Sequence, residues 1–369
     1  MAVHVTGIGV ISSLGGNPVA FADALRSGRH GCALHPFKRL DGTTVTAPAY
    51  AAVTPEPQGL IEPRKLRRMF RLVRMAAVAA RQALQMAQRD PAAMDPSRIG
   101  IVFGTAFGAL EITQKFIDSW VEQGERHASP LSFMNSVHGI LASQIALDIN
   151  ATGMNLTISQ RDISFEAALA HGMEQLEAGR VDLMLVGGAD ELTPLVHEIG
   201  SHALQVNLDA ADARGLDPLA RRPVVIPGDG AAVAVLEREG KPLARLLDAR
   251  AGRHDHGGPD VALDLWREQG KPGLELITNN RDGGIRSTRI HDRREALWRR
   301  ECNAPFASHR GAFGTFATAG ALQFAADVLM LAGREAFTPV ATAPRTILHD
   351  AASSSGVHAA YLMKAVGGG

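Results

Sequence analysis

The chain has 369 residues, of which 46% are hydrophobic and 21% charged, and it contains two cysteines, Cys32 and Cys302. This length can bury a large core, as two domains or one large α/β unit, and so few cysteines exclude a disulfide scaffold. The formal net charge of +0 favours neither nucleic acid nor an anionic membrane, and no apolar run approaches the roughly 20 residues that span a bilayer. Because Met1 runs into a strand-like segment without a basic leader, we expect a cytoplasmic protein.

Strand-like and helix-like segments alternate along the chain, which predicts an α/β layered fold. The expected strands are Val3–Ser12, Ile99–Ala106, Asn155–Ser159, Val181–Gly188, Gly230–Glu237, Leu274–Asn279 and Val357–Lys364. The expected helices are Pro18–Arg26, Lys65–Gln85, Gly108–Gln123, Phe165–Ala178 and Ala319–Leu331. The most loop-like stretch is Ala249–Pro259, which divides the chain into a first half of residues 1–248 and a shorter second half of residues 249–369.

Five segments stand in an order and at a spacing that are similar to those of one protein family. They are Val5–Gly15 (VTGIGVISSLG), Ile101–Gly108, Gly153–Ser159 (GMNLTIS), Gly179–Glu191 (GRVDLMLVGGADE) and Pro227–Glu237 (PGDGAAVAVLE). In this order they resemble the opening strand, the second core strand, the strand that delivers the nucleophile, the strand after the nucleophile helix and the Gly-acidic-Gly segment of the β-ketoacyl-acyl-carrier-protein synthases. The resemblance covers nearly the whole chain and is specific over roughly the first 240 residues.

The resemblance implies a thiolase fold, with two similar βαβαβαββ-like halves stacked in five α/β/α/β/α layers. It also implies an obligate dimer in which the strand before the nucleophile pairs across a twofold axis. In this chain the residues of that strand would be Asn155, Leu156, Thr157, Ile158 and Ser159. We expect no cofactor and no metal: His254 and His256 lie in a glycine-rich loop without a third ligand, which is typical of solvent-exposed histidines.

The reaction of this family needs a thiolate that carries the acyl chain and histidines that stabilise the enolate. The cysteine follows the strand by three positions, which corresponds to Asp162 in this chain. A carboxylate there cannot form the stable thioester that the reaction uses. Ile163 and Phe165 stand where the family has alanine and glycine, so both would fill space that a substrate needs. Asp162 itself would pair with a neighbour such as Arg161 or cap the following helix.

The other catalytic positions of the family also carry different residues in this chain. The first histidine corresponds to Asn280, just after the expected strand. In the family's Lys-x-x-x-Gly-His loop, the second histidine corresponds to Gly314 and the lysine to His309. Ala351–Val357 (AASSSGV) is similar to the glycine-rich gating loop but lacks its phenylalanines. Differences at several independent positions favour loss of catalysis.

The family contains non-catalytic members of this kind. Chain-length factors, the β subunits of type II polyketide synthases, lack the nucleophile, pair with an active synthase and shape the acyl tunnel. This chain is similar to the divergent, shorter β subunits of bacterial aryl polyene pathways. Two alternatives stay open. One is a malonyl-carrier-protein decarboxylase or atypical ketosynthase that uses Asp162, and the other is a free-standing scaffold homodimer.

The implied partners are a catalytically active synthase subunit, in a heterodimer, and an acyl carrier protein. The segment Glu62–Arg74 (EPRKLRRMFRLVR) is locally basic, and in the family the equivalent helix helps to dock the acidic carrier protein. We therefore assign docking of the carrier protein or of the partner subunit to Arg64, Lys65, Arg68 and Arg71. A solvated helix face is the alternative interpretation.

Overall fold

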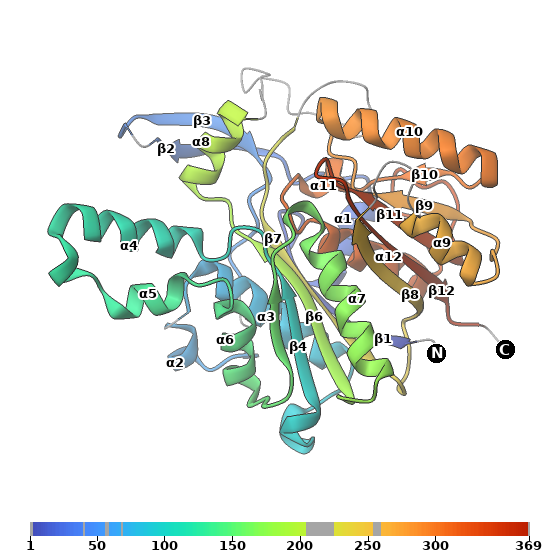
Figure 1. The fold of residues 1–369 in the computed structure, drawn as a ribbon, viewed down its shortest axis with the longest axis horizontal. Coiled ribbons are helices and arrows are strands. Elements are labelled where there is room, and N and C mark those ends of the chain that lie inside the picture. Colours follow the sequence, from blue (N-terminus) through green and yellow to red (C-terminus); the bar gives the residue numbers. More distant parts are fainter. Residues whose placement is uncertain are drawn as a thin grey trace.

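The structure is a computed structural model that describes residues 3–39, 41–55, 59–67, 69–203, 225–253 and 260–367. In this part of the chain, ten strands form one mixed sheet (Figure 1). They are β1 (Val3–Ile11), β4 (Ile99–Gly104), β5 (Asn155–Ile158), β6 (Leu183–Asp190), β7 (Gly230–Glu237), β8 (Ala244–Arg253), β9 (Leu276–Asn279), β10 (Phe306–Ala307), β11 (Thr346–Ala352) and β12 (Val357–Ala365). A separate antiparallel hairpin consists of β2 (Ala33–Lys38) and β3 (Thr44–Ala49).

The helices differ widely in length. They are α1 (Pro18–Arg26), α2 (Pro63–Leu66), α3 (Arg71–Met86), α4 (Leu110–Gln123), α5 (Pro130–Ser136), α6 (Ile140–Ile149), α7 (Ser164–Glu177), α8 (Pro194–Ala203), α9 (Val261–Glu268), α10 (Ile285–Glu301), α11 (Arg310–Phe313) and α12 (Gly320–Gly333). Three of the expected helices, Pro18–Arg26, Phe165–Ala178 and Ala319–Leu331, correspond to α1, α7 and α12. These three predictions are confirmed to within two residues at each end.

The large sheet consists of two halves with the same topology. The order is β5-β4-β6-β7-β1 in the first half and β10-β9-β11-β12-β8 in the second. Each half therefore places its own third, second, fourth, fifth and first strand side by side. In both halves the fifth strand is antiparallel to its neighbours, whereas the second and third strands are parallel. β1 and β8 join the halves through a short antiparallel contact in which Val3 pairs with Leu246 and Val5 with Ala244.

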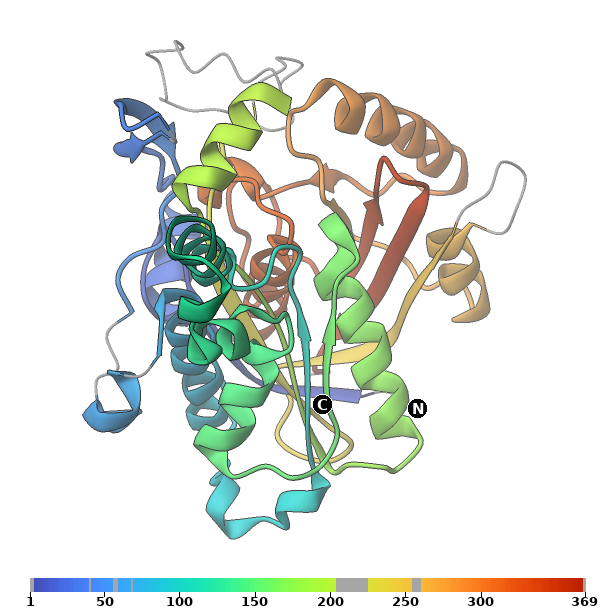
Figure 2. The same ribbon diagram turned by 60° about the vertical axis from the view of Figure 1, so that its left-hand side comes forward.

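The helices complete a stack of five layers. Helices α7 and α12 contact strands of both halves and therefore lie between them. On the outer face of the first half lie α3 and α6, and α9 and α10 cover the outer face of the second. Figure 2 shows α7 between the strands of the first half and the hairpin β11–β12. Each half thus buries both faces of its sheet, as strands with nearly continuous apolar sequences require.

Two glycines in β1 allow α3 to pack directly on the strand. A Cβ atom at Gly9 would lie 1.8 Å from the carbonyl oxygen of Ala79, and one at Gly7 would lie 2.0 Å from that of Ala83. No side chain fits at such distances, so this strand and helix are in contact through their backbones. The glycine-rich opening segment is therefore explained by packing.

Two sequence predictions are wrong in their boundaries. The single helix Lys65–Gln85 is interrupted: α2 ends at Leu66 and α3 begins at Arg71. Arg74 stabilises the interruption, because its Nη2 donates to the carbonyl oxygens of Leu66 (3.3 Å) and Met69 (3.0 Å).

The loop expected at Ala249–Pro259 begins with strand residues. β8 extends to Arg253 because it pairs with β12 along its whole length. The residues that follow, His254 and His256 among them, lie outside the described residues. The division of the chain after residue 248 falls inside β8, the first strand of the second half, and stays a prediction.

Candidate functional site

The predicted nucleophile position lies in a tight turn between β5 and α7. Arg161, Asp162 and Ile163 form one 3-10 turn, and Arg161 has a φ of 54°. A left-handed conformation costs a residue with a side chain about 1–2 kcal/mol, so other contacts must hold this turn. Ser164 provides them: its Oγ accepts from Gln160 N (2.8 Å) and donates to the carbonyl oxygen of Arg161 (2.6 Å).

Asp162 is held by a residue from near the C-terminus, 191 residues away in the sequence. Ser353, in the turn between β11 and β12, donates its hydroxyl to Asp162 Oδ1 at 2.7 Å. Burial raises the pKa of Asp162, and the Ser353 hydroxyl and the nearby charge of Arg310 partly oppose that rise. The expected pairing with Arg161 is wrong, because the partner is Ser353. The expected helix cap is also wrong, because the residue at the cap position is Ile163.

The position predicted to correspond to the family's first histidine carries an amide side chain that is hydrogen-bonded to backbone. Asn280 follows β9, and its Oδ1 accepts from Ala352 N (2.9 Å) while its Nδ2 donates to the carbonyl oxygen of Ala352 (3.4 Å). Ala352 immediately precedes Ser353, so this pair of hydrogen bonds brings Asn280 close to Asp162. The side-chain oxygen and one amide N–H of Asn280 are therefore engaged by the backbone of Ala352.

No side chain can be placed at the second histidine position. Gly314 has a φ of 89°, and a Cβ atom there would lie 2.5 Å from Cβ of Tyr50. Tyr50 is buried and donates its hydroxyl to the carbonyl oxygen of Gly311 at 2.7 Å. A histidine at this position would need both a strained backbone and the displacement of Tyr50.

The position that corresponds to the family's lysine is part of the buried interior. His309 accepts from Gln323 Nε2 at Nδ1 (2.9 Å), and its backbone N donates to Gln323 Oε1 (2.9 Å). Burial lowers the pKa of His309 to about 4, so the imidazole is neutral at pH 7. The cation near Asp162 is instead the next residue, Arg310, whose guanidinium Nε and Nη2 have no hydrogen-bond partner among the described residues.

The two residues that were expected to fill substrate space are both fully buried. Ile163 packs with Ala351 and Ala359 of the second half. Phe165 lies in the central core, with its ring 5.5 Å from that of Phe324. That Ile163 and Phe165 fill space which a substrate would need stays a prediction.

Sequence reasoning missed three residues of this site: Tyr50, Arg310 and Ser353. The run of three serines in the gating-loop segment and the arginine beside His309 were visible signals for two of them. Tyr50 gave no such signal, because it lies far from the site in sequence.

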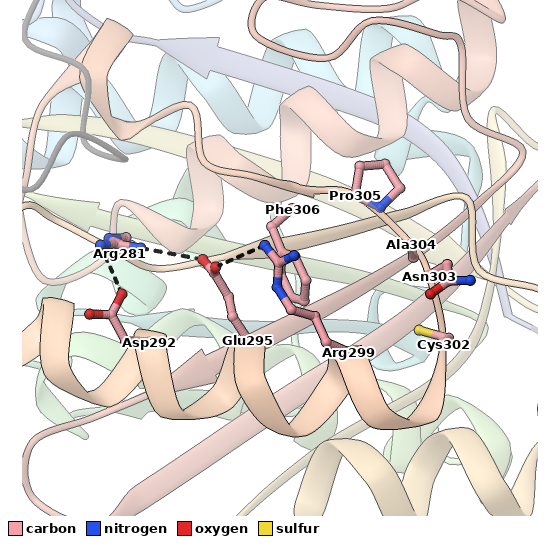
Figure 3. Close-up of a pocket in the computed structure, with 9 residues that line it drawn as sticks. All are labelled: Arg281, Asp292, Glu295, Arg299, Cys302, Asn303, Ala304, Pro305 and Phe306. Carbon is pink, nitrogen blue, oxygen red and sulfur yellow. Dashed lines mark hydrogen bonds and ion pairs between the residues drawn. The ribbon is translucent and has the colours of Figure 1, made fainter.

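A separate pocket of about 520 Å³ lies between α10 and the segment that leads into β10 (Figure 3). Arg281 enters it from the strand side and forms ion pairs with Asp292 (3.2 Å) and Glu295 (3.3 Å) of the helix. Cys302, which is only partly exposed, lines the pocket as a free thiol. Neither Asp162 nor any other residue that corresponds to a catalytic position lines this pocket.

The expected dimer strand lies at the edge of the sheet. β5 pairs with β4 on one side, and no described strand lies on its other side. Helix α6 contacts β5 and also α5, and α4 and α5 pack on each other and project from the body at the left (Figure 1). They and the residues that flank them expose large apolar side chains, which we call the α4–α5 apolar surface: Phe107, Ile117, Trp120, Val121, Leu131, Phe133, Met134 and Val137.

Two of the four residues assigned to docking are committed to internal ion pairs. Arg71 pairs with the buried Asp229 of the Gly-acidic-Gly segment, and Lys65 Nζ lies 3.2 Å from Asp148 Oδ1. Arg64 is exposed, and Arg68 lies outside the described residues. Arg64 and Lys65 lie in α2 and Arg71 in α3, so these three residues do not belong to one continuous helix. The docking role stays a prediction.

Comparison with known proteins agrees with this topology. The profile described as "Beta-ketoacyl synthase, N-terminal domain" matches residues 1–241. The tetracenomycin polyketide synthase ketoacyl synthase alpha subunit of Streptomyces glaucescens is 27% identical over 366 residues, covering 89% of this chain and 84% of the relative. Nodulation protein E of Rhizobium sp. (strain N33) is 27% identical over 235 residues, covering 64% of this chain and 57% of the relative. The chain thus spans little more than half the length of that second relative.

Solved structures share the fold over almost the whole chain. A β-ketoacyl synthase from Burkholderia phymatum STM815 has a TM-score of 0.84 at 19% identity, covering 99% of this chain and 100% of its own. The ishigamide ketosynthase/chain length factor has a TM-score of 0.82 at 20% identity, covering 99% of both chains. A ketosynthase in complex with its chain length factor from Xenorhabdus doucetiae has a TM-score of 0.78 at 18% identity, covering 99% of this chain and 98% of its own.

The duplicated topology and the five layers define a thiolase-type ketosynthase fold, as the sequence predicted. The chain belongs to the β-ketoacyl synthase family. No helix within the described ranges is both long and apolar enough to cross a bilayer. In the same part of the chain, no group of three or more His, Cys, Asp or Glu side chains could hold a metal ion.

Proposed function

We propose that this chain is a non-catalytic subunit of the chain-length-factor kind, which pairs with a catalytically active β-ketoacyl synthase. The observation that carries this proposal lies in the turn between β5 and α7. There Asp162 stands at the predicted nucleophile position and accepts a hydrogen bond from Ser353. A carboxylate cannot carry the growing chain as a stable thioester.

The two enolate-stabilising positions support the same proposal. Asn280 is bound to the backbone of Ala352, and Gly314 has no room for an imidazole beside Tyr50. Decarboxylative condensation depends on donors that are aligned with the developing oxyanion. Restoring the cysteine alone would therefore leave the reaction without its electrostatic stabilisation.

The partner is inferred from the sheet edge and from the neighbouring surface. The free edge of β5 presents unpaired backbone groups, and an exposed apolar surface of this extent is typical of a protein interface. Structural neighbours of this chain include complexes of a ketosynthase with its chain length factor. An acyl carrier protein and an aryl polyene product belong to the same proposal.

One observation favours a second candidate. Burial raises the pKa of Asp162, and an acid with a raised pKa can deliver a proton to an enolate formed by decarboxylation. A malonyl-carrier-protein decarboxylase, or an atypical ketosynthase that uses Asp162, would then be the function.

The test is to incubate the purified chain with malonyl- and acyl-carrier protein, alone and after co-expression with synthases encoded beside it. We expect no acyl adduct on this chain and no acetyl-carrier protein from the chain alone by mass spectrometry. Size-exclusion chromatography with light scattering should show a complex of one chain with one synthase. Acetyl-carrier protein formed by the chain alone, and lost in Asp162→Asn, would support the decarboxylase instead.

A further inference from the structure

Four arginines line the solvent side of α10. At 100° per residue, Arg286, Arg289, Arg293 and Arg300 fall within an arc of about 60° over a length of about 21 Å. All four side chains are exposed, and none has an ion-pair or hydrogen-bond partner among the residues that the structure describes. We call this set the α10 arginine stripe.

The helix that carries the stripe is firmly anchored. On its buried side, Arg294 Nε donates to Asp350 Oδ2 (2.6 Å) and Trp298 Nε1 donates to the same oxygen (2.7 Å). Arg294 also forms an ion pair with Asp260 at 2.8 Å. The stripe is therefore held on a fixed element, and ordering the helix adds no entropic cost on binding.

Local stability does not explain the stripe. Like charges three or four residues apart on a helix repel each other, and Arg286 and Arg289 lie near the helix N-terminus, where the helix dipole disfavours cations. The first turn contains no acidic residue. A chain with a formal net charge of +0 has nevertheless concentrated positive charge on one helix face. A ligand of opposite charge would offset this cost.

We propose that the α10 arginine stripe is a docking surface for an acidic helix of a partner protein. If the proposed function is correct, that partner is the acyl carrier protein, bound at a place distinct from the segment Glu62–Arg74. The arginines form a straight row, as carboxylates on one face of a partner helix would. Because Arg286, Arg289 and Arg293 are spaced at i, i+3 and i+7, carboxylates at the same spacing on that helix could face them.

The residues around the stripe argue against other anionic ligands. The aromatic residue within the helix, Trp298, is buried on the opposite side, so no aromatic ring is exposed along the stripe, whereas bases of single-stranded nucleic acid stack on aromatic rings. No exposed large apolar side chain accompanies it, whereas helices that lie in a membrane surface present Trp, Phe or Leu.

The stripe is also free when the sheet edge is occupied. Helix α10 lies at the upper right and α4 and α5 project at the left (Figure 1), and β10, which follows α10 in the chain, is at the opposite edge of the sheet from β5. A synthase bound at β5 and the α4–α5 apolar surface would leave α10 open to solvent. Both partners could therefore be bound at once.

The test compares Arg289→Glu/Arg293→Glu with the control Lys38→Glu/Arg39→Glu, which changes the charge equally at two exposed residues, the last of β2 and the one after it. The probe is the holo form of a type II polyketide synthase acyl carrier protein, with binding measured by fluorescence anisotropy in 50 mM and 500 mM NaCl. We expect Kd in low salt to rise at least about tenfold for the stripe variant and less than about twofold for the control. The difference should shrink in high salt.

Equal effects of the two variants, or no binding by the unmodified chain, would overturn the proposal. So would tighter binding to vesicles with 30% phosphatidylserine or to a 20-nucleotide single strand than to the carrier protein. Circular dichroism checks that both variants fold. The assay needs neither catalysis nor a synthase, so its outcome is independent of the pairing test. Carrier-protein binding without a synthase complex would retain this inference and refute the proposed pairing.

Discussion

The state of Asp162 depends on a single hydroxyl from the second half of the chain. Ser353 satisfies one carboxylate oxygen in a buried turn, and the charge of Arg310 also lowers the Asp162 pKa, against the larger rise that burial causes. These contacts suit a carboxylate, whereas a neutral thiol is a weak hydrogen-bond acceptor and carries no charge for Arg310 to stabilise.

The variant Asp162→Cys should therefore not condense acyl groups. The reason is that Asn280 and Gly314 leave an enolate without stabilisation, even if the new thiol becomes acylated. Mass spectrometry of carrier-protein products after incubation with malonyl- and acyl-carrier protein is the measurement. A β-ketoacyl product from the variant alone would contradict this reading of the site.

Glu191 makes folding stability depend on pH. Burial raises its pKa to about 7, so between the unfolded value of about 4.3 and pH 7 the folded protein binds more protons than the unfolded chain. The free energy of unfolding therefore falls as pH rises through this window. This contribution to stability is fully present below the unfolded pKa.

Replacing Glu191 by glutamine should remove most of that fall. The difference in free energy of unfolding between Glu191→Gln and the natural chain should shift in favour of the variant by about 2–3 kcal/mol from pH 4.5 to pH 7.5. Urea unfolding at the two pH values measures it, with the exposed Glu122→Gln as control. Parallel pH profiles for Glu191→Gln and the natural chain would show that Glu191 does not titrate in this range.

At the scale of elements, the contact of β1 with α3 leaves no room for side chains. Gly9→Ala would drive a methyl group into the carbonyl oxygen of Ala79 and should cost about 2–4 kcal/mol. Gly273→Ala, where an added Cβ meets nothing within 4 Å, should change stability by less than about 0.5 kcal/mol. Chemical denaturation of both variants tests this difference, and equal midpoints would mean that α3 can shift away.

The backbone of β5 alternates between its own sheet and the free edge. Ile101 N donates to the carbonyl oxygen of Met154, and Thr105 N to that of Ile158. In a parallel strand the groups of every second residue face the same neighbour, so those of Thr157 face outward. A partner strand would need the N–H of Thr157.

Thr157→Pro should consequently abolish pairing with a partner while leaving the bonds to β4 intact, because proline removes the outward donor. Leu156→Pro is the control, since it removes a donor that faces β4 and should destabilise the chain itself. Light scattering of co-expressed chain and synthase, together with thermal unfolding, separates the two effects. A Thr157→Pro chain that still assembles with the synthase would exclude β5 as the pairing strand.

At the scale of the whole molecule, the exposed apolar side chains are distributed unevenly. Val121, Leu131 and Met134 are 78%, 67% and 64% exposed, and all three lie on or beside the projecting helices α4 and α5. A lone chain would keep this surface in water, which favours self-association. Obligate subunits commonly depend on their partner for stable folding.

The double variant Val121→Ser/Met134→Ser should raise the soluble yield of the lone chain and weaken the complex with the synthase by about tenfold or more, because apolar burial is lost. Val19→Ser/Leu34→Ser, at residues that are similarly exposed but lie on α1 and β2, is the control and should leave the complex unchanged. Analytical ultracentrifugation measures both. Equal affinities would remove this surface from the interface.

What the sequence by itself determined is the local pattern and the chemical identity of each position. The strands of the first half could be predicted because continuous apolar runs and glycines are local signals. That Asp162, Asn280 and Gly314 stand at catalytic positions is a prediction from the resemblance to the family. Helix α10 gave no such signal, since its buried side carries Arg294 and Trp298 with polar partners in place of an apolar stripe.

The contacts between distant segments were decided only by the tertiary structure. Asp162 meets Ser353 across 191 residues, and Arg71 pairs with the buried Asp229 across 158. Tyr50 excludes a side chain at Gly314. β8 is a strand despite its polar composition, because β12 pairs with it throughout. Each of these contacts depends on which segments the fold brings together. The periodicity of a single segment carries no information about its distant neighbours.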